Sequence, residues 1–389
     1  MRYLSADRIF PISSPVMDKA VIVVKEEGII EEVITDDSVL DPLKIETFRG
    51  ILCPGFVNTH CHLELSHLKG KIKEHTGIVG FAKELMQKRF SVPADEIRQA
   101  MLDADRDMRE NGIVAVGDIS NDATSFPVKS ESAIYYHTFI ELLSLNPERA
   151  ELVFEAGKVL LEQLKHFHLP GSLAPHAPYS VSTALLRLIS EHQAFPTSMH
   201  NQESKAEDDF IRDKKGDFVS LYEFLQLPLD HFSASRTSAL QHALPHFSKE
   251  KKTLLVHNTY TTKEDLEQAL LIHSNLYWCL CPNANLYIEN KLPDVPALLK
   301  QACQITVGTD SLASNHQLSV LEELKTLSEN FQAISLDQLL TWATYNGAEF
   351  LGKEKELGTI AKGTKPGLNL ISDLENDQLT KASKVRRIM

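Results

Sequence analysis

The sequence predicts an α/β protein, in which a (β/α)8 TIM barrel is joined to a small β-sandwich domain that the N- and C-terminal segments build together. Three observations lead to this prediction. From Leu52 onward, short apolar runs alternate with helical patterns, which is typical of parallel βα units. Histidine and carboxylate side chains recur directly after those runs. The 389 residues are more than one core normally holds, which favours a large domain with a smaller one beside it.

Both ends of the chain carry β patterns. Short apolar runs predict strands at Ala20–Val24 and Ile29–Ile34, with a turn at Gly28. The tail shows similar patterns in Gly358–Gly363 and Leu368–Ile371. We therefore expect the two ends to pair in one small domain, which gives the division into residues 1–50 with 352–389 for the small domain and 51–351 for the barrel.

Eight short apolar runs predict the strands of the barrel. Helical patterns separate them, and the repeat fits eight βα units better than a doubly wound sheet, because no glycine-rich phosphate loop follows the first run. The predicted strands are Ile51–Asn58, Ile113–Ile119, Tyr135–Leu142, Ser172–Pro175, Pro196–His200, Thr253–His257, Leu276–Cys281 and Ile305–Gly308.

Amphipathic patterns predict helices at Ala94–Asn111, Ser182–His192 and Thr262–His273. Gly112 stops the first of them. A further amphipathic stretch, Gly77–Phe90, follows the loop after the first strand. Packing is the expected role of its apolar side, and a partial lid over the active face is the alternative.

Composition and charge exclude several classes of protein. The net charge of −13 argues against a nucleic-acid partner. No apolar run approaches 18 residues, so no membrane span is expected. The start of the chain lacks the apolar region of a secretory signal. Five cysteines without a repeated CxxC suit the cytoplasm better than a disulfide framework. A homodimer is left open.

Two histidines, His60 and His62, stand at the end of the first apolar stretch. Ile51–Cys53 predicts a buried strand, and residues i and i+2 of a strand point to the same face. Two imidazoles on one face make a poor core and half of a good metal site, since neutral imidazole is the commonest metal ligand. Cys61 lies between them, and we expect it to be a small buried hydrophobe.

Histidine or carboxylate residues follow most of the other predicted strands as well. The C-terminal ends of the strands form the active face of a TIM barrel. Singly, each residue has an ordinary explanation, such as a helix N-cap for Asp310 or a solvated loop for Glu203. Such explanations do not account for the recurrence at one end. The residues are His60, His62, Glu141, His176, His200, Glu203, His257 and Asp310.

Other histidines lack this placement. His166 and His168 form a second His-x-His pair, but they precede the fourth predicted strand and would lie at the opposite end of the barrel. We expect them to have a surface or structural role. His67, His75 and His316 fall in loops on the active face, where contact with a substrate is open but not required.

Three imidazoles and one carboxylate form a ligand set that suits Zn²⁺, although Fe²⁺ and Mn²⁺ accept similar sets. One divalent metal ion with an open position would lower the pKa of a bound water towards neutrality. Glu203 would shuttle protons, because it lies near the metal without being needed as a ligand. Asp310 would bind the metal and take the proton of the water, and His257 would orient that water.

Several segments, taken in order, resemble the amidohydrolase superfamily, in the branch of cytosine, guanine and adenosine-type aminohydrolases that also holds chlorohydrolases. The tail departs from the usual pattern at Pro366-Gly367, which puts the size of the small domain in doubt but not the chemistry. The matching segments are Pro54–Leu63, Pro175–Ser180, His200–Glu203, His257, Cys281–Asn285 and Gly308–Ser311.

The resemblance implies the role of each residue. Glu203 would carry a proton to the ring nitrogen and to the leaving ammonia, and His257 would assist the attacking water. The binuclear branch has a bridging lysine after strand four, where this chain has His176, so one metal is expected. The implied ligands of that divalent metal ion are His60, His62, His200 and Asp310.

The implied reaction is the hydrolytic deamination of a small amino-substituted N-heterocycle, similar to a purine nucleoside. His62–Ser66 resembles a stretch of aminodeoxyfutalosine deaminases, in which case Glu64 would reach a ribose hydroxyl or an amine; an ion pair with Lys69 is the competing explanation. Glu141 and His176 are further substrate-binding candidates.

One alternative is a hydrolase that releases chloride or an amine from a triazine-like ring. A non-catalytic barrel should lack the ligands or the shuttle, and here both are present.

Overall fold

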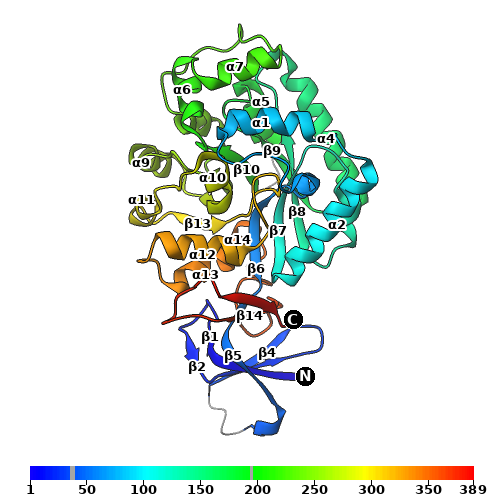
Figure 1. Cartoon of the computed structure of the whole chain (residues 1–389), viewed down its shortest axis with the longest axis vertical. Helices are drawn as coiled ribbons and strands as arrows, with labels where there is room; N and C mark the ends of the chain where they lie inside the picture. The colour runs from blue at the N-terminus through cyan, green and yellow to red at the C-terminus, as the bar shows by residue number, and fades with distance from the viewer. Residues whose placement is uncertain (36–39, 193–195) are drawn as a thin grey trace.

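Eight parallel strands, separated by helical segments, form the larger part of the molecule (Figure 1). The computed structural model describes residues 1–35, 40–192 and 196–389. The strands make two four-stranded parallel sheets, ordered β6-β7-β8-β9 and β10-β11-β12-β13. Their bounds are Phe56–Cys61 (β6), Ile113–Ser120 (β7), Tyr135–Leu142 (β8), Gly171–Pro175 (β9), Thr197–Asn201 (β10), Thr253–His257 (β11), Leu276–Leu280 (β12) and Gln304–Val307 (β13).

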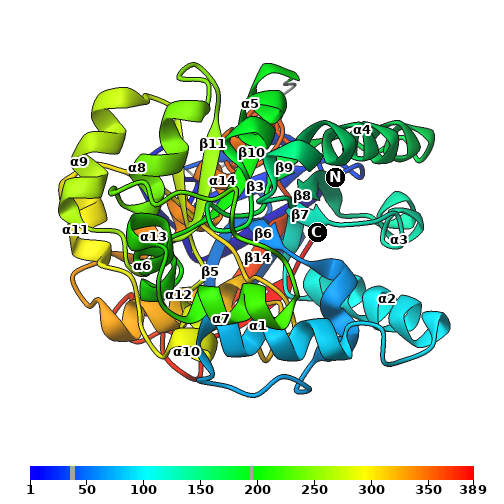
Figure 2. The ribbon, with the colours of Figure 1, turned by 90° about the horizontal axis from the view of Figure 1, so that it is seen from above.

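Helices surround these strands when the molecule is seen from above (Figure 2). Each predicted helix agrees with the structure to within two residues at either end. The bounds are Gly77–Lys88 (α1), Ala94–Glu110 (α2), Phe126–Glu131 (α3), Ala150–His166 (α4), Thr183–His192 (α5), Lys205–Asp213 (α6), Asp217–Phe224 (α7), Ala239–Ala243 (α8), Lys263–Ile272 (α9), Pro282–Glu289 (α10), Val295–Lys300 (α11), Val320–Asn330 (α12), Leu336–Ala343 (α13) and Tyr345–Phe350 (α14).

The two sheets meet along their edges near the carboxyl ends of the strands. The backbone N–H of His200 donates to the carbonyl of His176, just beyond β9, at 2.9 Å. On the other side the N–H of Asp310, beyond β13, donates to the carbonyl of His60 in β6 at 3.0 Å. Cys61 and Asp310 also form a parallel bridge. These contacts bring the ends of β6, β9, β10 and β13 together.

The predicted first strand, Ile51–Asn58, is wrong as a single strand. Residues Ile45–Pro54 form β5, which belongs to another sheet, and β6 starts only at Phe56. The chain changes sheet at Gly55, where a side chain would lie 2.3 Å from Val114 Cγ1. The apolar run before the histidines is therefore a buried strand, as expected, but it belongs to the small sheet. The other seven predicted strands agree to within one residue at each end.

The small sheet joins the two ends of the chain. It has seven strands, in the order β15-β14-β5-β1-β3-β4, with β2 paired to β1. The tail strand β14 pairs antiparallel with β5, as the sequence suggests. The strands are Arg2–Ile9 (β1), Met17–Asp18 (β2), Val21–Val24 (β3), Ile30–Ile34 (β4), Ile45–Pro54 (β5), Leu368–Ser372 (β14) and Lys384–Arg387 (β15).

One predicted tail strand is wrong. Gly358–Gly363 forms turns rather than a strand, because Gly358 and Gly363 both have positive φ, at 82° and 87°. The segment still contacts the small sheet, since the N–H of Gly363 donates to the carbonyl of Ile30 at 2.8 Å. The second layer of a β-sandwich and the division at residues 50 and 352 stay predictions.

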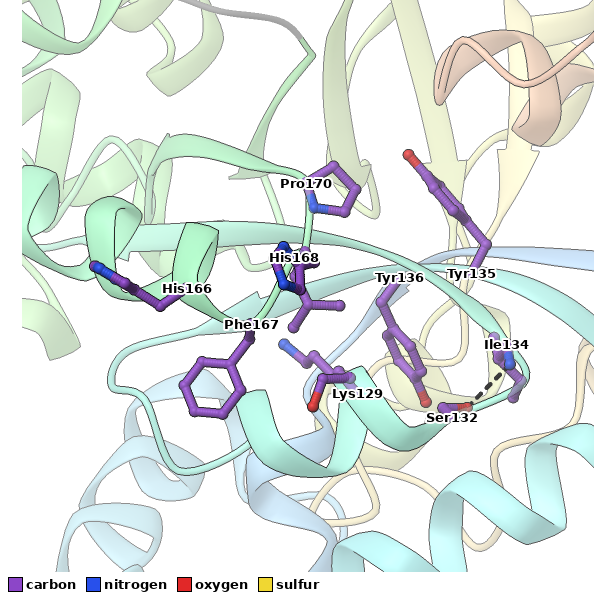
Figure 3. A pocket seen from close by; sticks show the side chains of 11 residues that line it. Lys129, Ser132, Ile134, Tyr135, Tyr136, His166, Phe167, His168 and Pro170 are labelled. Atoms are coloured by element: carbon purple, nitrogen blue, oxygen red, sulfur yellow. Dashed lines mark hydrogen bonds between the residues drawn. The ribbon is translucent and has the colours of Figure 1, made fainter.

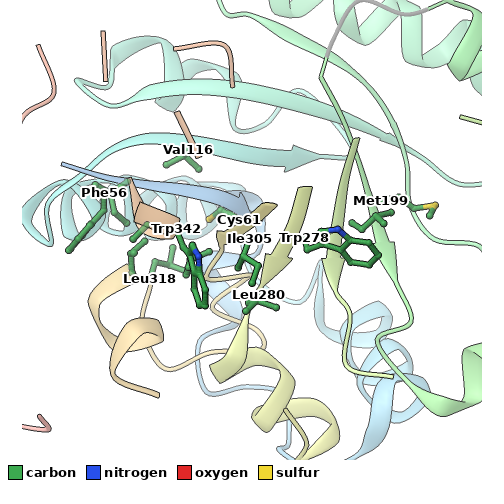
Figure 4. Close-up of a cluster of buried hydrophobic side chains, with 14 of the residues drawn as sticks. Phe56, Cys61, Val116, Met199, Trp278, Leu280, Ile305, Leu318 and Trp342 are labelled. Atoms are coloured by element: carbon green, nitrogen blue, oxygen red, sulfur yellow. The ribbon is translucent and has the colours of Figure 1, made fainter. Parts of the chain in front are cut away.

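The largest core cluster lies between the parallel strands and the helices that cover them (Figure 4). Trp278 is completely buried there, near Leu280 of the same strand and paired with Ile305 of the neighbouring strand β13. Truncating a core tryptophan to alanine typically costs about 3–5 kcal/mol. Cys61 belongs to the same cluster, which confirms its expected role as a buried hydrophobe, and the five cysteines are free thiols. In the described ranges no helix combines the length and the hydropathy needed to cross a bilayer.

Gly308 lies where the core packs closely against the histidine cluster, and a substitution there tests this packing. A Cβ at this position would lie 2.7 Å from the Cβ of His60 and 2.8 Å from the Sγ of Cys279. We expect Gly308→Ala to destabilise the protein by about 1–3 kcal/mol through overpacking, seen as a lower midpoint of thermal unfolding. Gly308→Ala/Cys279→Ala removes one clash and should recover part of the loss. An unchanged midpoint in the single variant would contradict this close packing.

Candidate metal site and active site

His60 and His62 converge because β6 has an irregular end. Between Asn58 and Cys61 the strand advances one residue more than its partner β7, which is a β-bulge. Bulges redirect side chains and are common beside active sites. The strand ends at Cys61, so His62 lies just beyond it, as the residue before the 3-10 helix η3 (Leu63–Leu68). The two Nε2 atoms lie 3.2 Å apart, which confirms the expected convergence although simple strand alternation does not produce it.

Three further residues close the cluster. Asp310 Oδ1 lies 3.4 Å from the Nε2 atom of both His60 and His62. His200 has a ring nitrogen within 4.8 Å of those of His60 and His62. A ring nitrogen of His257 also lies within 4.8 Å of the ligand atoms of His60 and Asp310. The carboxyl ends of β6, β10, β11 and β13 thus deliver five donor groups to one place.

Hydrogen bonds fix the tautomers of two of these imidazoles. The Nδ1 atom of His200 contacts the backbone carbonyl of His176 at 2.9 Å, and Nδ1 of His257 contacts Asn285 Oδ1 at 2.9 Å. Both partners are acceptors, so Nδ1 carries the hydrogen and Nε2 keeps a free lone pair. Burial also lowers the pKa of His62 and His200 well below the ordinary value, which favours neutral rings. Neutral imidazoles with free Nε2 lone pairs are the form that binds metals.

The backbone is strained at two of the donors. His257 has φ 75° and Asp310 has φ 55°, a left-handed conformation that non-glycine residues rarely adopt. Such strain is concentrated at functional sites. Hydrogen bonds hold the strained residue Asp310 in place, since Ser314 Oγ donates to its Oδ2 at 2.5 Å. The N–H of Thr309 donates to Asn58 Oδ1 at 3.1 Å and ties the same turn to β6.

These residues fit a divalent cation. Asp310 and three imidazoles lie close together with little exposure to water, between 0% for His60 and 8% for His62. Lone pairs of several donors then face one another, which is unfavourable unless a cation stands between them. The set of three nitrogens and one carboxylate oxygen is one that Zn²⁺ accepts. Within the described residues, His60 Nδ1 is also buried without a hydrogen-bond partner.

Glu203 lies beside this cluster, after the end of β10. Its Oε1 is 3.7 Å from His257 Nε2, and its backbone N–H donates to the buried carboxylate of Glu207 at 3.1 Å. Burial raises the pKa of Glu203 well above its ordinary value, and the nearby Asp310 carboxylate raises it further. A carboxyl group that keeps its proton near neutral pH can act as a general acid.

A cavity of about 70 Å³ joins the cluster to an apolar wall. The wall includes Ile78, Phe81 and Leu85, so α1 forms part of the site as well as packing against α7 and α10. The residues that line the cavity are His62, Leu65, Ile78, Phe81, Leu85, His176, Tyr179, His200, Glu203, His257, Ile288, Asp310 and Ser311.

The three substrate-binding candidates lie at different depths. His176 lines the cavity, and its Nδ1 contacts Ser180 Oγ at 2.6 Å. Glu141 lies behind it, with Oε1 3.5 Å from His200 Nδ1. Glu64 is buried behind the cavity wall as well; neither carboxylate lines the cavity.

Glu64 is held by the end of α1. It forms an ion pair with Arg89, the residue that follows the helix, rather than with Lys69 as the competing explanation supposed. The N–H of Asn121 donates to Glu64 Oε2 at 3.2 Å, and Asn121 Nδ2 donates to Glu141 Oε2 at 2.8 Å. Asn121 and Arg89 therefore connect the two candidate carboxylates, and neither carries a sequence signal that would have singled it out.

The remaining histidines lie elsewhere. His166 and His168 are exposed beside a surface pocket of about 510 Å³ at the start of β8 and β9, at the opposite end from the cluster (Figure 3). Their expected surface role is confirmed. His67 contacts the backbone carbonyl of Arg89 at 2.8 Å. His75 and His316 flank Glu74. The last three histidines do not line the cavity.

A family comparison adds to this geometry. Residues 51–388 match the model of the amidohydrolase family. The chain belongs to this family. The match covers the parallel strands, the five donors and the tail strand, and it makes the protein a hydrolase of carbon–nitrogen bonds.

Named relatives cover most of the chain. An adenosine deaminase from Helicobacter pylori is 27% identical over 356 residues, which are 89% of this chain and 85% of that protein. An aminodeoxyfutalosine deaminase from a Nitratiruptor species is 25% identical over 337 residues, 83% of this chain and 79% of that one.

Solved structures show the same fold. Aminofutalosine deaminase from Helicobacter pylori, in complex with methylthio-coformycin, superposes with a TM-score of 0.82 over 100% of both chains at 23% identity. An atrazine chlorohydrolase from Arthrobacter aurescens, complexed with zinc, gives a TM-score of 0.74 at 16% identity, covering 95% of this chain and 86% of the other.

The donor cluster predicts how the protein binds metal. We expect close to one zinc ion per chain, measured by atomic emission after dialysis, and His200→Ala should lose most of it because that variant removes a buried nitrogen donor. The matched control is His168→Ala, which changes an exposed histidine and should keep full metal content. Two ions per chain would contradict the expectation of a single metal and would point to the neighbouring group of Glu141, His176 and His200.

Proposed function

We propose that this protein is a metal-dependent hydrolytic deaminase that removes the amino group of a purine-nucleoside-like ring and releases ammonia. One observation carries the proposal: three residues of the donor cluster line the same cavity as Glu203 and His257, namely His62, His200 and Asp310. The donor set provides for the metal, and a buried carboxyl with a raised pKa provides for proton transfer. Relatives named as deaminases of adenosine and aminodeoxyfutalosine support the reaction class.

In this proposal His60, His62, His200 and Asp310 hold one divalent ion, most simply Zn²⁺. A bound ion of this kind would lower the pKa of a coordinated water to about 7. Asp310 accepts the first proton of the attacking water, and Nε2 of His257 orients that water. Glu203 donates its proton to the ring nitrogen as the carbon is attacked. Asp310 then passes the proton taken from the water to the amino group, and the bond between the ring carbon and that nitrogen breaks to release ammonia. The carbonyl forms as the hydroxyl group of the adduct returns a proton to Glu203, so both carboxyl groups regain their starting states.

The size of the cavity bears on how a substrate enters. Pockets for small molecules commonly measure about 300–1,000 Å³, so a cavity of about 70 Å³ must widen to hold a nucleoside. The wall formed by α1 carries none of the donor residues, and we propose that it shifts outward to admit the substrate. Since Arg89 follows α1 directly, an outward shift of this helix would also withdraw Arg89 from Glu64. The freed carboxylate would accept hydrogen bonds from ribose hydroxyls, with Glu141 and His176 nearer the ring.

The architecture proposed from the sequence has similar support. We propose that the two four-stranded sheets are halves of one closed (β/α)8 barrel, which is supported by the hydrogen bonds between their edges and by the fold of the related structures. A cytoplasmic location is proposed on the free cysteines and on the enzyme class.

The test is ammonia release from zinc-loaded protein with adenosine-type nucleosides, aminodeoxyfutalosine, guanine, cytosine and pterins. We expect release from one class, and Glu203→Gln should lower kcat by about 10²–10⁴-fold because general acid catalysis is lost. Zinc content should be unchanged. The matched control is Glu191→Gln, an exposed carboxylate at the end of α5. Chloride release from a chlorotriazine without ammonia from any ring would replace the proposal by the chlorohydrolase alternative.

Glu64 gives a second test. Glu64→Ala should raise KM for the nucleoside about two- to tenfold, since a hydrogen bond typically contributes about 0.5–1.5 kcal/mol. KM for the corresponding free base, which has no ribose, should stay the same and serves as the control. An equal change in both KM values would assign Glu64 to the support of the site rather than to ribose binding.

A further inference from the structure

An ion pair outside the donor cluster is fully buried. Lys129 Nζ, on α3, lies 2.5 Å from Asp118 Oδ2, near the end of β7, and both side chains are 0% exposed. Removing two charges from water costs free energy that apolar side chains of similar size would not cost. Stability is therefore a weak explanation for this pair, and its other contacts are informative.

The second oxygen of Asp118 contacts the segment that holds a metal-ligand candidate. Asp118 Oδ1 accepts the backbone N–H of Leu63 at 2.8 Å. Leu63 directly follows His62 and is the first residue of η3, where the backbone N–H has no partner inside the helix. His62 makes no side-chain capping bond there. The carboxylate from the neighbouring strand supplies the missing acceptor.

Lys129 keeps that carboxylate in place. Its Nζ also donates to Ser120 Oγ at 2.8 Å and to Thr138 Oγ1 at 3.2 Å, on β7 and β8. The ammonium group lies 5.9 Å from the ring of Tyr136, whose side chain is drawn beside Lys129 in Figure 3. With its cation fixed to two strands, Asp118 has little freedom to turn away from Leu63. Because of the β-bulge, Cys61 at the end of β6 pairs with Asp118 of β7. The Asp118 carboxylate therefore lies beside the end of β6.

We propose that Asp118, fixed by Lys129, is a positioning residue that holds His62 in the metal site by accepting the N–H of Leu63. The inference rests on the metal site of the proposed function. It adds a residue that does not touch the metal but holds the backbone beside one of its ligands. Partners that orient metal ligands typically change metal affinity by 10–100-fold when removed. The expected effect is therefore on zinc affinity and on the geometry of the bound metal, beyond any effect on folding.

Two double variants distinguish the loss of the hydrogen-bond acceptor for Leu63 from the loss of the charges on Asp118 and Lys129. Asp118→Asn/Lys129→Met removes both charges but keeps an amide oxygen toward Leu63. Asp118→Leu/Lys129→Met removes the same charges and leaves no acceptor. The metal-free proteins are titrated with zinc against a competing chelator, and their folding is compared by circular dichroism and thermal unfolding. The visible spectrum of the cobalt-loaded proteins reports the geometry of the metal ligands.

We expect the leucine variant to bind zinc at least tenfold more weakly than the asparagine variant, with an altered cobalt spectrum and similar unfolding midpoints for the metal-free forms. Equal zinc affinity and equal spectra in the two variants would overturn the positioning role. If the leucine variant does not fold, Asp118→Ala/Lys129→Met makes the same comparison. Wild-type protein that binds no zinc would overturn the metal site itself, and the inference with it.

Discussion

The structure depends on keeping the Asp310 carboxylate and the imidazoles of His60, His62 and His200 close together in a place that water hardly reaches. Distances of 3.2–3.4 Å between donor atoms are contacts that a cation would stabilise. Without a cation, lone pairs oppose one another and burial penalises the carboxylate. The fold must therefore supply the rigidity that holds these groups, and much of the polar chemistry inside it serves that purpose.

That rigidity comes from neighbours that do not touch the proposed metal. Asn285 fixes the tautomer of His257, and Ser314 holds Asp310. Strain at His257 and Asp310 is tolerated because strand ends and hydrogen bonds restrict the backbone on both sides. The Asp118–Lys129 pair belongs to the same class of support. Buried polar groups of this kind are costly when half satisfied and specify one geometry when fully satisfied.

The sequence predicts much of this site, for a physical reason. In parallel βα units the carboxyl ends of the strands meet at one face, so chemical groups placed after each strand must converge. Convergence of His60, His62, His200, His257, Glu203 and Asp310 follows from that rule together with the strand pattern. The apolar run before His60 is misleading because β5 and β6 are almost continuous in sequence. The chain passes from one sheet to the other at Gly55, where β5 pairs with the tail strand and β6 pairs with β7.

The sequence alone determined seven of the eight predicted barrel strands, four of the helices and the face that carries the chemistry, because these follow from local hydrophobic periods. The tertiary structure decided what the residues on that face contact. The bulge that turns His60 toward His62 depends on the register with β7. The pairing of Glu64 with Arg89, the cavity wall from α1 and the buried Lys129–Asp118 pair each join residues of different elements. Such contacts arise from packing between elements, which no local pattern in the sequence encodes.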